Sequence, residues 1–243
     1  MSTLFDAIGP SSAGQVSTSA ATGQTWTHTA GAGGGTVLVF LSIGIASGPF
    51  GSTGTLSGVT YGGHAMTQLA VVNADGASGN GGALWVFGIT GQAAGANTVL
   101  VGTFTPPSGG TFVSFIGYSA SFTGGGSFGT PVTNSGSGTG DSVAVSTAGS
   151  GSLVAGSFSS GTGSQAITAG TQRWLVNQYG TTAVGATCGA TAPGTGSSVT
   201  ISATWSSDWY AGFGVEVLPA SGATPVTQAP STALQAVKRS AYY

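Results

Sequence analysis

Charged side chains are what the sequence has least of. Asp, Glu, Lys and Arg make up 3% of the 243 residues, whereas about 25% is typical of a soluble protein. Three basic residues cannot form the run of cations that follows a nucleic-acid backbone, so nucleic acid is excluded as a partner. The surface must consist mainly of Ser, Thr, Asn, Gly and backbone, which leaves little charge repulsion against association. This composition suits a protein that is packed against neighbours or that faces uncharged sugars.

Cysteines and long apolar runs are also scarce. Cys188 is the only cysteine, which excludes an internal disulfide and argues against structural zinc. The longest apolar stretch, Val37–Ile45, is interrupted by Ser42 and Gly44 and is too short for a spanning helix, so no membrane insertion is expected. Met1–Pro10 lacks the basic start and the continuous apolar segment of a secretion signal. Because the composition looks extracellular without a visible export route, we expect a virus particle protein, made in a host cytoplasm and released by lysis.

Glycine, by contrast, is abundant, and it separates short apolar runs throughout the chain. In Val59–Leu69, two β-prone runs flank Gly62-Gly63, a pair that readily takes the positive φ of a tight hairpin turn. A loop at Gly62-Gly63 pairs Val59 with Met66, whereas a loop one residue later pairs Tyr61 with Met66. The sequence leaves both registers open.

Alternating apolar and polar residues predict strands from Gln24 to Leu218. Ser198–Trp205 and Trp209–Leu218 alternate on either side of an expected turn at Ser206–Asp208, with Glu216 on the outward face. Thr36–Ile45 is apolar on both faces and is predicted to be a central strand. The other predicted strands are Gly82–Ile89, Asn97–Phe104, Thr111–Phe122, Asp141–Ser146, Ser152–Ser159, Thr171–Tyr179 and Thr181–Cys188.

Later segments of the chain echo earlier ones in the order of their strands. The matching pairs are Asp141–Phe158 with Gln24–Phe40, Thr168–Leu175 with Thr60–Leu69, and Ser197–Trp205 plus Trp209–Leu218 with Asn97–Phe104 plus Thr111–Phe122. Two tandem sandwiches are one explanation. A single sandwich whose halves run through matching strands is preferred, because no linker separates the halves. The predicted fold is therefore an all-β, antiparallel, jelly-roll-like β-sandwich over residues 1–219.

Residues 220–243 carry no strand pattern. Ala220–Ser231 contains two prolines and indicates an extended linker, and Thr232–Gln235 fits a helix capping box. A docking peptide that anchors the sandwich to a partner is one interpretation, and a frayed, solubilising end is the other. The candidate docking residues are Leu234, Val237, Lys238, Arg239, Tyr242 and Tyr243.

Motifs with chemical meaning are weak. Gly124–Gly129 matches the glycine pattern of dinucleotide-binding sites and the nucleophile elbow of serine hydrolases, with Ser127 as the nucleophile. Both motifs need a helix directly afterwards, and Pro131 with a Gly/Ser run follows instead. His28 and His64 have no further histidine and no clustered carboxylates beside them, so a hydrogen-bonded or exposed histidine is preferred to a metal ligand or general base. No enzyme activity, cofactor or metal is expected.

Aromatic residues cluster near the end of the strand region. Trp209 and Tyr210 are candidates for stacking on a glycan, because sugar-binding sandwiches use exposed aromatic faces in this way. The preferred interpretation places Trp205 and Trp209 in the core, as their alternation suggests, with Tyr210 capping its edge.

Several short motifs follow one another along Leu4–Ala220. They are Phe5-Asp6-Ala7, Trp26-Thr27-His28-Thr29, Val59-Thr60-Tyr61-Gly62-Gly63, Met66-Thr67, Leu84-Trp85, Tyr118-Ser119-Ala120, Ser152-Leu153-Val154, Trp209 and Glu216-Val217-Leu218-Pro219. In this order they resemble a family of Gly/Thr-rich jelly-roll domains in actinobacterial phage virion proteins, often described as minor tail proteins. The resemblance implies a jelly-roll sandwich with a structural or host-surface-binding role, and it implies no catalytic residues.

Two functions of different classes follow. The first is a virion structural protein, either a minor tail or a capsid-decorating protein, that forms homo-oligomers and contacts other virion subunits. The second is a carbohydrate-binding module that recognises a host cell-wall glycan. Hydrolysis of such a glycan is a third reading that no cluster of carboxylates in the sequence supports.

Overall fold

The computed structural model describes residues 2–10, 14–33, 35–47, 52–74, 81–177 and 185–221. Every regular element in these ranges is a β-strand, and all pairings between the strands are antiparallel. The all-β class and the antiparallel pairing predicted from the sequence are confirmed.

The first half of the chain forms two facing sheets. The first inner sheet has the order β1-β12-β4-β9-β8, with β2 paired to β12, and the first outer sheet has the order β3-β10-β6-β7. A short pair, β5 and β11, completes this half. The strands are β1 (Leu4–Gly9), β2 (Gln15–Ser17), β3 (Thr25–Ala30), β4 (Gly35–Ala46), β5 (Thr55–Leu56), β6 (Val59–Tyr61), β7 (His64–Ala65), β8 (Thr67–Asn73), β9 (Gly81–Gln92), β10 (Gly95–Val101), β11 (Phe104–Thr105) and β12 (Thr111–Thr123).

The second half forms one sheet that folds over itself. Its strands are β13 (Gly125–Phe128), β14 (Val132–Ser146), β15 (Leu153–Ser160), β16 (Ala166–Ala169), β17 (Thr171–Val176), β18 (Ala186–Pro193) and β19 (Ser198–Pro219). Their order is β13-β19-β15-β18-β17, and β14 and β16 also pair with β19. The later part of β19, from Asp208, pairs with β15 and the start of β14 in an inner layer, whereas the earlier part, up to Thr204, pairs with the end of β14 and with β16 in an outer layer.

The two halves have the same strand order. The row β12-β4-β9-β8 corresponds to β19-β15-β18-β17, and the row β3-β10-β6 corresponds to β14-β19-β16. The echoes found in the sequence are therefore confirmed as strands in equivalent positions. No described strand of residues 2–123 pairs with a described strand of residues 125–219.

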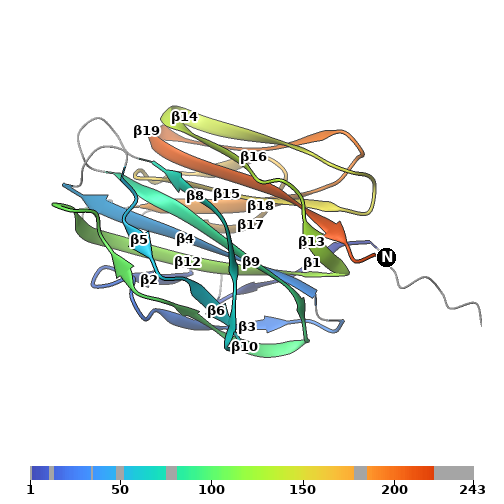
Figure 1. The fold of residues 1–243 in the computed structure, drawn as a ribbon. Coiled ribbons are helices and arrows are strands. Elements are labelled where there is room, and N and C mark those ends of the chain that lie inside the picture. The colour runs from blue at the N-terminus through green and yellow to red at the C-terminus, as the bar shows by residue number, and fades with distance from the viewer. Residues whose placement is uncertain are drawn as a thin grey trace, which may run out of the picture.

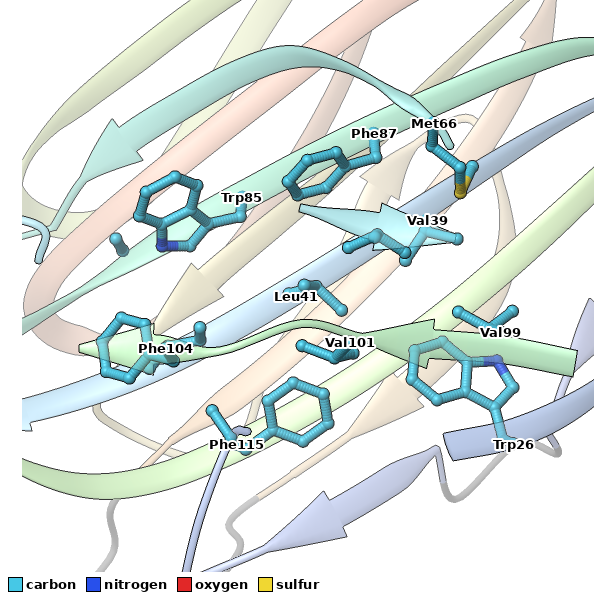
Figure 2. Close-up of a cluster of buried hydrophobic side chains, with 14 of the residues drawn as sticks. Trp26, Val39, Leu41, Met66, Trp85, Phe87, Val99, Val101, Phe104 and Phe115 are labelled. Carbon is cyan, nitrogen blue, oxygen red and sulfur yellow. The ribbon is translucent and has the colours of Figure 1, made fainter. Parts of the chain in front are cut away.

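Three buried apolar clusters hold the layers together. Figure 1 shows the outer strands β3 and β10 at one side of the stack and β14 and β19 at the other. The first cluster fills the space between the first outer and first inner sheets, with Trp26, Leu41 and Val99 among its members (Figure 2). The second lies between the two inner layers and draws residues from both halves, and the third lies within the second half. The second cluster thus joins the halves into one body.

Strand β4 is apolar on both faces because the first inner sheet lies between two clusters. Val39 and Leu41 point into the first cluster, whereas Leu38 and Phe40 point into the second. Successive residues of a strand face opposite sides, so a strand between two cores needs an unbroken apolar run. The prediction of a central strand at Thr36–Ile45 is confirmed.

The hairpin at Gly62-Gly63 takes the first of the two registers that the sequence left open. Both glycines have positive φ, 56° and 83°, as a type I′ turn requires. Tyr61 pairs with His64, and the Met66 N–H donates to the Val59 carbonyl at 2.9 Å.

The turn predicted at Ser206–Asp208 is wrong, because β19 continues through it. Between Thr204 and Asp208 the pairing with β14 shifts register, and this irregularity lies where β19 passes from the outer to the inner layer. The shift interrupts the alternation of apolar and polar residues between Trp205 and Trp209. In the sequence this interruption resembles a turn between two strands.

Glu216 also differs from the prediction, which placed it outward. The side chain is buried, and its Oε1 accepts a hydrogen bond of 2.8 Å from the N–H of Ala148. A backbone donor from the loop after β14 therefore compensates the carboxylate for its lost hydration.

Candidate functional site

An open cleft lies where the two inner layers meet at one end of the molecule. It has a volume of about 570 Å³, within the range usual for small-ligand sites. The first half contributes the ends of β4, β9 and β12 and the residue after β8. The second half contributes the end of β15 with the segment after it, and the middle of β19. Its lining includes Ser42, Gly44, Ala46, Gly82, Ser159 and Trp209.

The cleft exists because the side chains that face the opposite half become small along the strands. On β4 the row begins with Leu38 and Phe40 in the second cluster and continues with Ser42, Gly44 and Ala46 in the cleft. Packed sheets stay about 10 Å apart when large side chains fill the gap. Small residues at the end of the same rows leave that gap empty.

Hydroxyl groups and one carboxylate line the cleft. The hydroxyls of Ser42 and Ser159 hydrogen-bond to each other across the boundary between the halves. On the second half, Ser160 Oγ donates to the Thr162 carbonyl at 3.0 Å, and Thr162 Oγ1 donates to the Ser206 carbonyl at 3.0 Å. These bonds fix the segment after β15 against β19, beside the carboxylate of Asp208.

Asp208 lies close to the backbone of this segment. A Cβ built on Gly161 would lie 2.6 Å from Asp208 Oδ2, so glycine makes room for the carboxylate. Among the described residues none donates a side-chain or backbone hydrogen bond to Asp208. Neither Asp208 nor the serines are marked as site residues by any motif in the sequence. The available signal was the change from bulky to small residues at alternate positions of β4.

The two candidate stacking residues lie on opposite faces of β19. Trp209 lines the cleft, and it is half-buried and belongs to none of the three clusters. Tyr210 packs against the third cluster, with its ring 5.3 Å from that of Trp205. Burial and the nearby Asp141 raise the pKa of Tyr210. Placement in the core is thus confirmed for Trp205 and wrong for Trp209, and the structure does not bring Trp209 and Tyr210 to one surface.

His28 is the centre of a buried polar cluster between β1, β3 and β12. Its Nδ1 lies 2.8 Å from Ser119 Oγ, which also accepts a hydrogen bond of 2.9 Å from Trp26 Nε1. Asp6 Oδ2 accepts hydrogen bonds from the Gly31 N–H at 2.6 Å and from Ser121 Oγ at 2.7 Å. Burial lowers the pKa of His28 to about 4, although Asp6 acts in the opposite direction.

This cluster has the residue types of a serine hydrolase triad but not its arrangement. Asp6 bonds Ser121 and Gly31 rather than His28. His28 and Ser119 have no exposed surface, so no substrate reaches the hydroxyl. The preferred reading of His28 as a hydrogen-bonded histidine is confirmed. His64, at the hairpin turn, is exposed, as expected.

The glycine motif at Gly124–Gly129 is followed by a strand. Gly125–Phe128 forms β13 and Val132–Ser146 forms β14, so no helix presents its N-terminus there. Rejection of both the dinucleotide and the nucleophile-elbow interpretations is confirmed.

The candidate docking residues of the C-terminal peptide, Leu234 to Tyr243, lie outside the described residues. Within the described ranges, no group of three or more His, Cys, Asp or Glu side chains could hold a metal ion. The same ranges contain no helix long and apolar enough to cross a membrane.

Comparison with protein-family models, curated proteins and solved structures yields no match.

Proposed function

We propose that the chain is a non-enzymatic structural protein of a phage virion, a minor tail or capsid-decorating protein with a jelly-roll-like fold. It assembles through contacts between copies and with other virion subunits, and its C-terminal peptide serves as an anchor. The ordered motifs that resemble virion jelly-roll domains support this proposal. The structural observation that supports this proposal most directly is that the described charged side chains are buried or half-buried.

Within the described part of the chain no ionisable Asp, Glu or Arg side chain is fully exposed. Asp6, Asp141, Arg173 and Asp208 are half-buried, and Glu216 is buried. Three of the half-buried groups turn toward protein partners. Asp6 bonds Ser121, Asp141 accepts a hydrogen bond of 2.6 Å from Asn134, and Arg173 lies 3.9 Å above the ring of Phe5. The exposed surface of the described residues is therefore poor in ions and opposes close packing of copies only weakly.

The outer strands show what this surface presents instead. Thr25, Thr27 and Thr29 are exposed on β3, and Thr200 and Thr204 are exposed on β19 at the opposite side of the stack (Figure 1). Such uncharged, hydroxyl-bearing faces lose little solvation energy when another neutral surface covers them, compared with faces that carry ions.

Added charge tests the assembly. Sedimentation of the purified full chain over a range of concentrations is expected to show self-association. Thr27→Lys combined with Thr200→Lys should shift the chain to monomers through like-charge repulsion, and salt should partly restore association. Thr27→Ser with Thr200→Ser is the matched control. A monodisperse monomer at every concentration, together with the absence of the chain's peptides from purified particles, would overturn the proposal.

Removal of residues 220–243 tests the anchor separately. Loss of incorporation into particles with unchanged circular dichroism is expected. Unchanged incorporation would remove the anchoring role and leave the assembly proposal intact.

A further inference from the structure

We propose that the cleft between the halves binds an uncharged saccharide, with Trp209 as the stacking surface and Asp208 as the acceptor for sugar hydroxyls. This goes beyond a role in assembly, which needs no ligand.

Among the lining residues that the structure describes there is one carboxylate and no basic side chain. Asp208 is the ionisable group among the lining residues that the structure describes. An anionic ligand would enter this cleft without a cation to pair with and next to a negative charge, at a cost that grows as water is displaced. Phosphates, sulfated sugars and uronic acids are therefore poor ligands for it.

The polar groups suit hydroxyl-rich ligands. Ser42, Ser159, Ser160 and Thr162 bring hydroxyls into the lining. Ser160 and Thr162 donate their hydrogens to backbone carbonyls, so these two hydroxyls can accept hydrogen bonds from a ligand. In the Ser42–Ser159 pair one hydroxyl donates to the other, which leaves one hydrogen for a ligand. A carboxylate with two available oxygens accepts hydrogen bonds from two neighbouring hydroxyls of a sugar, in charge-assisted bonds that are stronger than neutral ones. Asp208, with no described donor, has this capacity.

Trp209 supplies the apolar surface that a sugar needs. One face of a pyranose ring presents C–H groups, which pack on an aromatic ring and displace water from both. Trp209 is half-buried, so its ring is held by the protein while part of it remains accessible. An ammonium ligand is less suited, because it is usually enclosed by several aromatic rings, whereas Trp209 is the aromatic among the described lining residues.

The tryptophan content gives this site its own signal. The chain has five tryptophans, and Trp26, Trp85, Trp174 and Trp205 are all buried. A neutral quencher such as acrylamide should therefore reach Trp209 far more readily than the others. A ligand in the cleft protects Trp209 and reduces the quenching.

The experiment is a titration of the full chain, followed by acrylamide quenching and by calorimetry. The probes are neutral mono- and disaccharides of gluco, galacto, manno and arabino configuration, with glucuronic acid and choline as the charged comparisons. We expect saturable protection by at least one neutral sugar and none by glucuronic acid. Trp209→Ala should weaken binding by about tenfold or more, and Asp208→Asn should weaken it several-fold.

Tyr210→Ala is the matched control, since its ring lies on the opposite face of β19 and its loss should leave the affinity unchanged. Because Trp209→Ala removes the fluorescent reporter, calorimetry measures its affinity, and circular dichroism checks its fold. Three results would each overturn the proposal. They are no binding of any neutral sugar, binding of choline alone, and sugar binding that Trp209→Ala leaves intact.

Discussion

At the scale of single residues, His28 shows how a polar side chain is tolerated in an apolar core. Its Nδ1 has a partner in Ser119, whereas its Nε2 is buried without one among the described residues. A neutral imidazole can leave one nitrogen unpaired at moderate cost, but an imidazolium at this position would be a buried charge. Burial outweighs the attraction of Asp6 and holds the pKa of His28 near 4.

This environment predicts an acid-sensitive fold. The ordinary pKa of histidine in an unfolded chain is about 6.5, so between that value and about 4 the unfolded state binds more protons than the folded one. Stability is therefore lost as the pH falls through this window, by about 3 kcal/mol in total, and this group causes no further loss below it. Urea unfolding measured at intervals from pH 7 to pH 4 tests the slope.

Two variants separate this histidine from the other titrating groups. His28→Asn keeps a polar partner for Ser119 and removes the ionisation, so its stability should vary less with pH than that of the unmodified chain. His64→Gln removes the exposed histidine and should leave the slope unchanged. Parallel pH profiles for His28→Asn and the unmodified chain would contradict the assignment.

At the scale of elements, strand β18 shows how partner strands set the bounds of a strand that the sequence placed elsewhere. Of the strand expected over Thr181–Cys188, residues 181–184 lie outside the described residues, and β18 runs from Ala186 to Pro193. Its pairing with β15 sets Cys188 opposite Phe158 and Gly189 opposite Ser157. The partner strands and the ring above Gly189, rather than local alternation, determine where β18 lies.

Gly189 is the residue that this packing requires. The indole of Trp174 lies directly over it, and a Cβ built on Gly189 would overlap the ring. Gly189→Ala should therefore destabilise the chain by about 1–3 kcal/mol, the usual cost of overpacking a filled core. Gly149→Ala is the control, because a Cβ at Gly149 would have no neighbour within 4 Å. Thermal unfolding of both variants measures the difference, and equal midpoints would contradict the packing argument.

An element could be predicted from the sequence where residues within that element are enough to identify it. β4 could be recognised because both of its faces are apolar, and the hairpin could be recognised because Gly62-Gly63 suits one kind of turn. The first part of β14, residues 132–140, was missed, since it consists mostly of Gly, Ser and Thr with little burial and is ordered by pairing with β19, whereas its end was predicted as Asp141–Ser146. β1 was missed because Asp6 interrupts it, and that carboxylate is satisfied by residues distant in sequence.

Of the residues in the candidate site, only Trp209 could be predicted from the sequence, because the others are brought together by contacts distant in sequence. Trp209 drew attention as an aromatic residue near a predicted turn. Asp208, Ser42 and Ser159 have no mutual spacing in the sequence that marks a site, because they meet only when the second half packs on the first. A site built at the boundary between two halves is visible only after the pairing of both is known.

At the scale of the whole molecule, the second cluster couples two halves whose described strands do not pair with each other. Aromatic residues dominate the contact. Trp174 of the second half packs on Phe40 and Tyr118 of the first, with ring centroids 4.9 Å and 5.5 Å apart, and Phe40 also meets Phe213 at 6.1 Å. Arg173 lies above the ring of Phe5 at the edge of the same contact. Each half thus buries one inner face only when the other is present, which predicts that the unmodified chain unfolds in a single transition.

Weakening this contact should separate the halves. Phe40→Ala removes a ring that touches two aromatic residues of the opposite half, and a loss of about 3–5 kcal/mol is expected for a large side chain deleted from a core. Because the loss falls on the coupling between halves, calorimetry should resolve two transitions in this variant. Phe158→Ala deletes the same side chain from the third cluster, which belongs to the second half alone, so it should lower the midpoint while the coupling through the second cluster persists. Two transitions in the unmodified chain would contradict this, because they would mean that each half is stable with its inner face uncovered.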